Sequence, residues 1–116
     1  MKTLRLALIA LLSLAWLLPA QAQNTRMYNT VKTKLAAGEQ VVGGTVDTPD
    51  PEIYCAMANS GFDFIWIEMQ HSSLNYTDVA RMIWACRDAP AVPFIRIPNA
   101  TEGDIQKATD IGALGL

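Results

Sequence analysis

Short apolar runs typical of β-strands alternate with segments of helical periodicity along most of this 116-residue chain. The apolar runs begin near residues 41, 62, 92 and 113, and apolar residues recur at helical spacing between them. Parallel strands need a crossover connection, usually a helix, so this alternation predicts an α/β fold with a parallel sheet. One more helix is predicted ahead of the first strand, where Tyr28, Val31 and Leu35 precede Gly38.

The spacing of the predicted strands also bears on the size of the complete fold. It corresponds to about one strand–helix unit per 24 residues, and eight units, enough to close a barrel, need roughly 200–250 residues. This sequence holds three units and the opening of a fourth strand at Ala113–Leu116. We therefore expect it to be the N-terminal part of a longer chain.

Three of the predicted helices begin with residue pairs that favour a helix N-terminus. These pairs are Asp50 with Pro51, Asn75 with Asp78, and Thr101 with Asp104. The strand predicted between the first two starts covers Phe62–Ile67. Its nearly continuous apolar character predicts a strand that is buried on both faces.

The first 22 residues are predicted to be a signal peptide. Lys2 and Arg5 supply positive charge ahead of the apolar core Leu6–Leu18, and small residues follow, so cleavage is expected between Ala22 and Gln23. The mature domain would then span residues 23–116 and be exported, to the periplasm or outside the cell, without a membrane anchor. The alternative is a retained anchor, although the apolar core is shorter than the ~20 residues of a membrane span.

Charge and cysteine use limit the kinds of partner. Charged residues make up 17% of the chain, the formal net charge is −2, and no basic patch stands out, so no nucleic-acid partner is expected.

Export would permit a disulfide between Cys55 and Cys86. Each cysteine lies in a helical apolar pattern, however, and we expect two buried thiols instead. A single histidine and no CxxC pair argue against a zinc cluster.

Polar residues follow two of the predicted strands, at the edge where parallel α/β folds bind ligands. Glu68, Gln70 and His71 come after one strand, and Arg96 lies at the end of the next. A carboxylate that accepts a hydrogen bond from an imidazole raises its basicity, so Glu68 with His71 suits a general base. Arg96 suits an anionic ligand. Two alternatives stay open: His71 caps a loop, and Arg96 forms only a structural salt bridge with Glu68.

Three segments of the chain carry motifs in an order typical of one known family. They are Gly61-Phe62-Asp63-Phe64-Ile65-Trp66-Ile67-Glu68-Met69-Gln70-His71, Phe94-Ile95-Arg96-Ile97-Pro98, and Asp110-Ile111-Gly112-Ala113. Together they resemble the HpcH/HpaI aldolase family, class II pyruvate aldolases that are related to citrate lyase beta subunits. The resemblance covers about residues 28–116, and the order and spacing of the motifs make it specific.

The resemblance implies a (β/α)8 TIM barrel, of which this chain holds about the first half. It also implies a divalent metal, Mg²⁺ or Mn²⁺, that stabilises the enolate of a 2-oxo acid. His71 corresponds to the catalytic base, and Glu68 to the acid that pairs with it, where well-known members have Asp. Arg96 corresponds to the arginine that binds the pyruvate carboxylate. Gln70 stands where many members have a Glu that helps to hold water near the metal. The family's metal ligands lie on later strands, past Leu116.

Two functions follow as hypotheses. The first is a metal-dependent carbon–carbon lyase that cleaves 4-hydroxy-2-oxo acids to pyruvate and an aldehyde, and that is a homo-oligomer when full length. Its partner would be a small-molecule 2-oxo acid, and residues 23–116 alone are expected to be inactive. The alternative is a non-catalytic exported α/β module that binds a carboxylate through Arg96.

Overall fold

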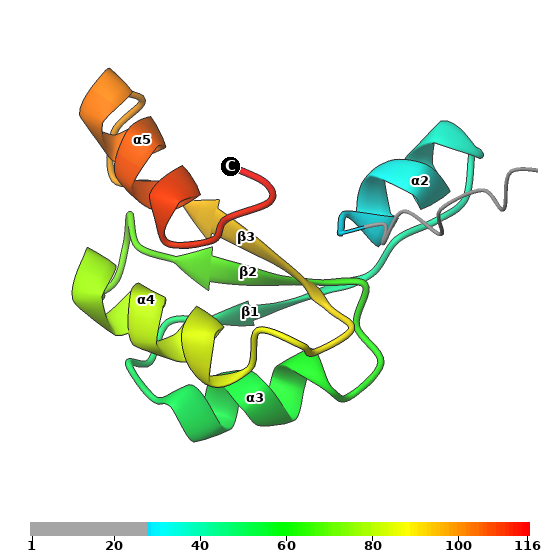
Figure 1. The fold of residues 1–116 in the computed structure, drawn as a ribbon, viewed down its shortest axis with the longest axis horizontal. Helices are drawn as coiled ribbons and strands as arrows, with labels where there is room; N and C mark the ends of the chain where they lie inside the picture. Colours follow the sequence, from blue (N-terminus) through cyan, green and yellow to red (C-terminus); the bar gives the residue numbers. More distant parts are fainter. Residues whose placement is uncertain (1–27) are drawn as a thin grey trace, which may run out of the picture.

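The computed structural model describes residues 28–116, and the predicted signal peptide with its cleavage site lies outside these residues. Helices and strands alternate along the described part of the chain (Figure 1). They are α2 (Thr30–Ala36), β1 (Gly43–Val46), α3 (Pro51–Ala58), β2 (Phe64–Glu68), α4 (Tyr76–Ala85), β3 (Val92–Arg96) and α5 (Glu102–Asp110). None of these helices has both the length and the apolar composition needed to cross a membrane.

The strands form a parallel sheet in the order β1-β2-β3, as the alternation of strands and helices predicts. Helices α3 and α4 lie side by side along the sheet (Figure 1). The predicted opening of a further strand is present as one parallel bridge between Gly115 and Phe94. The order of elements expected from the sequence is therefore confirmed for the described residues.

Capping side chains begin three of the helices where the sequence predicts them. Asp50 accepts hydrogen bonds from two amides in the first turn of α3. Asn75 and Asp78 form a capping box at the start of α4, and Thr101 caps α5. Each cap satisfies amide groups that have no partner within their own helix. The capped helix starts therefore fix the ends of the loops before them, including the loop of residues 69–74 that follows β2.

The expectation that the second strand is buried on both faces is wrong. Ile65 and Ile67 are fully buried, whereas Phe64, Trp66 and Glu68 are partly exposed. Because successive side chains of a strand point to opposite faces, β2 has one face in the core and one face that is partly open. The apolar run hides this alternation because two of the residues on the open face are aromatic.

Aromatic rings and glycines fill the open face near the start of the strands. The rings of Phe64 and Phe94 stack with their centroids 4.9 Å apart. Gly43 lies against the first ring and Gly115 against the second, and a Cβ atom at either glycine would collide with the ring. The glycines therefore let backbone and rings lie close together. The polar residues of this face are found farther along, at the carboxyl ends of β2 and β3.

The two cysteines are joined, contrary to the expectation of two buried thiols. Cys55 in α3 and Cys86 at the end of α4 form a disulfide, with their Cα atoms 5.5 Å apart. Helical periodicity assigns each cysteine to a helix, but it does not reveal that the two helices pack with those faces together. The contact between α3 and α4 supplies the missing relationship.

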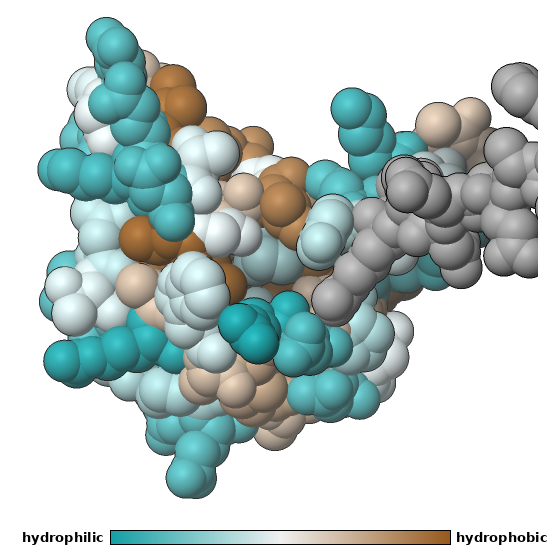
Figure 2. Space-filling model, viewed as in Figure 1, coloured by the Kyte–Doolittle hydropathy of each residue, from teal (hydrophilic) through white to brown (hydrophobic). Residues whose placement is uncertain are grey.

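Apolar surface remains open near the end of the described chain. Figure 2 shows hydrophilic residues on the outer side of α5 and apolar residues on its other side. Ile105 in α5 is 42% exposed, and the nearby Leu114 and Leu116 are 41% and 50% exposed. These leucines flank Gly115, which forms the bridge to β3, and they lie next to the open edge of the sheet.

Candidate active site

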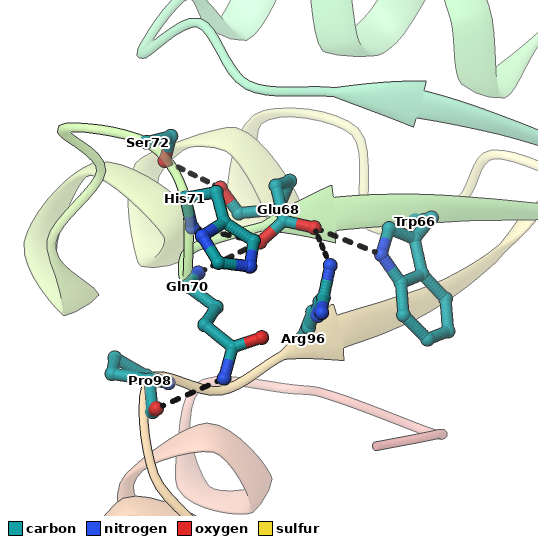
Figure 3. Close-up of polar contacts among 7 residues, drawn as sticks. All are labelled: Trp66, Glu68, Gln70, His71, Ser72, Arg96 and Pro98. Atoms are coloured by element: carbon teal, nitrogen blue, oxygen red, sulfur yellow. Dashed lines mark hydrogen bonds and ion pairs between the residues drawn. The ribbon is translucent and has the colours of Figure 1, made fainter.

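Glu68 and Arg96 meet at the carboxyl ends of β2 and β3 (Figure 3). They are direct partners in the parallel register, so their side chains lie on the same face of the sheet. Arg96 Nη1 lies 3.1 Å from Glu68 Oε2, with 43% of the Arg96 side chain and 13% of the Glu68 side chain exposed. The salt bridge that the sequence left as an alternative therefore exists, and it lies at the edge where such folds bind ligands.

The Glu68 carboxylate accepts hydrogen bonds from four N–H groups. Oε1 accepts from the backbone amides of Gln70 at 2.8 Å and His71 at 3.0 Å. Oε2 accepts from Arg96 Nη1 at 3.1 Å and from the Trp66 indole at 3.4 Å. Burial alone would raise the pKa of Glu68, but the His71 amide and the Arg96 and Trp66 side chains outweigh it and hold this pKa below its usual value. Glu68 is therefore an anion whose acceptor sites are occupied.

The expected pairing of Glu68 with the His71 imidazole is wrong, because the carboxylate binds the His71 main chain instead. A glutamate at a strand end is long enough to fold back onto the amides two and three residues ahead, as capping carboxylates do. The His71 side chain is exposed, and its ring has no hydrogen-bond partner within residues 28–116. Both ring nitrogens are therefore open to a ligand.

Hydrogen bonds hold the loop after β2 in place. The Ser72 hydroxyl donates to the Glu68 carbonyl and accepts from the Leu74 amide at 3.1 Å. The Gln70 side chain donates through Nε2 to the Pro98 carbonyl in the loop after β3, at 3.5 Å (Figure 3). The nitrogen of the Gln70 carboxamide is thus used by the protein, and its oxygen is left for a ligand.

The described residues do not form a divalent metal site by themselves. Within residues 28–116, no three His, Cys, Asp or Glu side chains are grouped so that they could hold an ion. At the strand ends, the oxygens of Glu68 are already taken by N–H donors. In the cluster of Glu68, Gln70, His71 and Arg96, this leaves the Gln70 amide oxygen and the His71 ring, whereas Mg²⁺ and Mn²⁺ require several oxygen ligands. Ligands past Leu116 stay a prediction.

The predicted site residues and one further residue are brought together. Glu68, Gln70, His71 and Arg96 all lie at the ends of β2 and β3 (Figure 3). Trp66 joins them through its hydrogen bond to Glu68. Its place in an apolar run hides this role, but its position two residues before Glu68 is a usable signal, since residues two apart in a strand share a face.

Known proteins resemble this chain across most of its length. No protein-family model matches it. A 4-hydroxy-4-methyl-2-oxoglutarate aldolase of Chaetomium globosum is 32% identical over 91 residues, which cover 77% of this chain and 34% of that protein. A hydroxypyruvate/pyruvate aldolase of Rhizorhabdus wittichii is 33% identical over 88 residues, which cover 76% of this chain and 35% of that protein. The chain therefore spans about a third of the length of these curated relatives.

A solved structure extends the resemblance to the fold. The crystal structure of an HpcH/HpaI aldolase/citrate lyase family protein from Burkholderia cenocepacia matches with a TM-score of 0.67 and 28% identity, over 73% of this chain and 34% of that one. The parallel α/β fold described above is thus similar to that of the family's TIM-barrel aldolases. The chain is therefore similar in sequence to these aldolases and similar in fold to that HpcH/HpaI aldolase/citrate lyase family protein.

Proposed function

We propose that the protein is a carbon–carbon lyase that cleaves 4-hydroxy-2-oxo acids to pyruvate and an aldehyde. The observation that carries the proposal is the arrangement at the two strand ends. Glu68 binds Arg96, and His71, whose ring has no hydrogen-bond partner within residues 28–116, follows Glu68 in the loop after β2. Gln70 joins this loop to the loop after β3 (Figure 3). This arrangement offers a cation for a substrate carboxylate and a base for its hydroxyl group.

The chemistry of cleavage assigns a role to each side chain. His71 takes the proton of the C4 hydroxyl, the C3–C4 bond breaks to release the aldehyde, and its electrons pass into the 2-oxo group. A proton returned to C3 then gives pyruvate. Arg96 binds the C1 carboxylate and faces the negative charge that develops beside it. Gln70 binds substrate or water through its amide oxygen. A divalent Mg²⁺ or Mn²⁺ ion, with ligands past Leu116, would supply further positive charge when bound.

The proposal includes the form and location of the complete protein. A (β/α)8 barrel would continue the sheet past the Gly115 bridge and cover the open apolar surface near Leu114 and Leu116. We propose a homo-oligomer when full length. We also propose that the protein is exported, because a disulfide such as Cys55–Cys86 persists mainly in oxidising compartments.

A second candidate is a non-catalytic exported module that binds a carboxylate through Arg96. Two features favour it. The Glu68 carboxylate is engaged by the main chain and does not assist the His71 ring. In addition, the amide of Gln70 is neutral and cannot act as a base. Both features leave the arginine able to bind an anion, so binding alone does not separate the two candidates.

Release of pyruvate distinguishes them. The full-length protein is incubated with a set of 4-hydroxy-2-oxo acids and Mg²⁺ or Mn²⁺, and pyruvate is measured with a coupled lactate dehydrogenase assay. We expect pyruvate from the wild type and from Arg81→Ala, a control that removes an exposed arginine of α4. We expect a strong loss from Arg96→Ala. If the wild type binds pyruvate in calorimetry but releases none from any substrate, the non-catalytic module is correct.

A further inference from the structure

Trp66 contacts the site from within β2. Its side chain lies on the same face as Glu68, two residues on, and its register partner in β3 is Phe94. The indole Nε1 donates to Glu68 Oε2 at 3.4 Å, the same oxygen that Arg96 binds (Figure 3). The position of Trp66 in an apolar run explains its ring as packing. It does not explain the hydrogen bond from the indole to Glu68.

The way in which the two oxygens of Glu68 are shared limits how Arg96 can bind. Carboxylates usually engage arginine through two parallel N–H···O bonds, one to each oxygen. Here Oε1 is held by the amides of Gln70 and His71. Arg96 therefore reaches Oε2 alone, through Nη1 alone. The indole N–H of Trp66 also donates to Oε2, so both lone pairs of this oxygen already accept a hydrogen bond. A second N–H group of Arg96 therefore finds no free lone pair on Oε2.

We infer that Trp66 is a positioning residue that keeps Arg96 available for the substrate carboxylate. This inference rests on the proposed function. With Trp66 present, Glu68 anchors the guanidinium through one nitrogen, and the remaining N–H groups can bind a carboxylate. Without the indole N–H, Arg96 can turn a second N–H group toward Oε2. The guanidinium would then be partly withdrawn from the substrate, which binds less tightly.

Trp66→Phe removes the indole N–H but keeps an aromatic ring on the same face of the sheet. In the full-length enzyme, we expect the KM for the 2-oxo acid to rise about 3–10-fold, as the loss of one hydrogen bond would cause, with kcat within about twofold. Trp84→Phe is the matched control, because Trp84 is 60% exposed on α4, and it should leave both constants unchanged. An unchanged KM in Trp66→Phe overturns the inference.

A spectroscopic measurement tests the same contact without activity. In an ¹⁵N-labelled wild-type sample, the Trp66 indole resonance is assigned by its loss in Trp66→Phe. We expect Glu68→Gln to move this resonance upfield, because a neutral amide replaces the carboxylate acceptor, and to leave the Trp84 resonance in place. If the chemical shift of the Trp66 indole is the same in wild type and Glu68→Gln, the hydrogen bond is absent, and this also overturns the inference.

Failure of the proposed function remains distinguishable from failure of this inference. If the wild type releases no pyruvate from any 4-hydroxy-2-oxo acid, the lyase is wrong. Calorimetric titration with pyruvate then replaces KM. A pyruvate Kd that is about 3–10-fold weaker in Trp66→Phe, and unchanged in Trp84→Phe, still supports the role of Trp66. An equal Kd in all three proteins contradicts it.

Discussion

Glu68 and Arg96 end neighbouring strands as direct register partners, and they form a salt bridge of 3.1 Å that involves one nitrogen and one oxygen. The pair is far from fully buried, since 43% of the Arg96 side chain is exposed. A salt bridge of this kind fixes the direction of the guanidinium without using up its donors. Structural pairing and substrate binding, the two alternatives for Arg96, are therefore compatible.

The first prediction concerns the planar fork of Arg96. Arg96→Lys keeps the positive charge but loses the planar set of donors that, in the proposed function, bind a substrate carboxylate and Glu68 at the same time. We expect the KM for 2-oxo acids to rise about 10-fold or more and kcat to fall as well. Steady-state kinetics of the full-length enzyme measure both constants. Arg81→Lys, on the exposed side of α4, is the control. Wild-type kinetics in Arg96→Lys would mean that charge alone is sufficient.

The second prediction concerns His71 as the base. His71→Ala removes the group that we propose takes the hydroxyl proton, so kcat should fall about 10²–10⁴-fold while KM changes much less. Ser73→Ala, an exposed position two residues along the same loop, should keep wild-type activity. If pyruvate release survives His71→Ala at a near wild-type rate, His71 is a loop residue without a catalytic role.

Much of the fold could be predicted because its signals are local. The caps at Asp50, Asn75 and Thr101 act within one helical turn, and the strands are marked by apolar runs that the structure retains. The Cys55–Cys86 disulfide could not be predicted in the same way. It depends on which faces of α3 and α4 pack together, and periodicity within one helix contains no information on its neighbour.

The site was predictable in position but not in its contacts. Parallel strands bring their carboxyl ends to one edge, so Glu68, His71 and Arg96 were expected to lie together. Whether the Glu68 carboxylate meets the His71 ring or the His71 amide depends on side-chain torsions and on the path of one loop. Sequence spacing is the same in both cases. Trp66 was hidden for a related reason, because an indole serves equally well as apolar filler and as a hydrogen-bond donor.

The third prediction concerns stability at alkaline pH. Tyr76 in α4 donates to Asp104 Oδ1 in α5 at 2.7 Å. Burial first, and then this hydrogen bond and the charge of Asp104, raise the pKa of Tyr76 to about 12. Since the folded pKa lies above the unfolded value, the contribution of Tyr76 is fully present below about pH 10 and is lost as the pH rises from 10 toward 12.

Urea unfolding between about pH 8 and pH 11 checks this. The free energy of unfolding of the wild type should fall in the upper part of this range. Tyr76→Phe should show a smaller fall, and the remainder should come in part from Tyr54, whose pKa burial also raises to about 12. The same slope in wild type and Tyr76→Phe would show that the link between α4 and α5 does not depend on the phenol.

The last prediction concerns the disulfide between α3 and α4. Cys55 and Cys86 are 31 residues apart in sequence, and opening a loop of this size should lower the free energy of unfolding by about 2–4 kcal/mol. We therefore expect the Cys55→Ala/Cys86→Ala double variant of the full-length protein to melt at a lower temperature than the wild type.

Activity should not change with this loss of stability. Cys86 lies at the C-terminal end of α4, and a helix that crosses back between parallel strands ends near the start of the next strand. The disulfide is therefore near the amino ends of the strands, whereas Glu68 and Arg96 lie at the carboxyl ends. For this reason kcat and KM at low temperature should equal those of the wild type. A reductant should lower the melting temperature of the wild type to that of the double variant, and should leave the double variant unaffected. Equal melting temperatures of wild type and double variant without reductant would show that the two helices do not depend on the bridge.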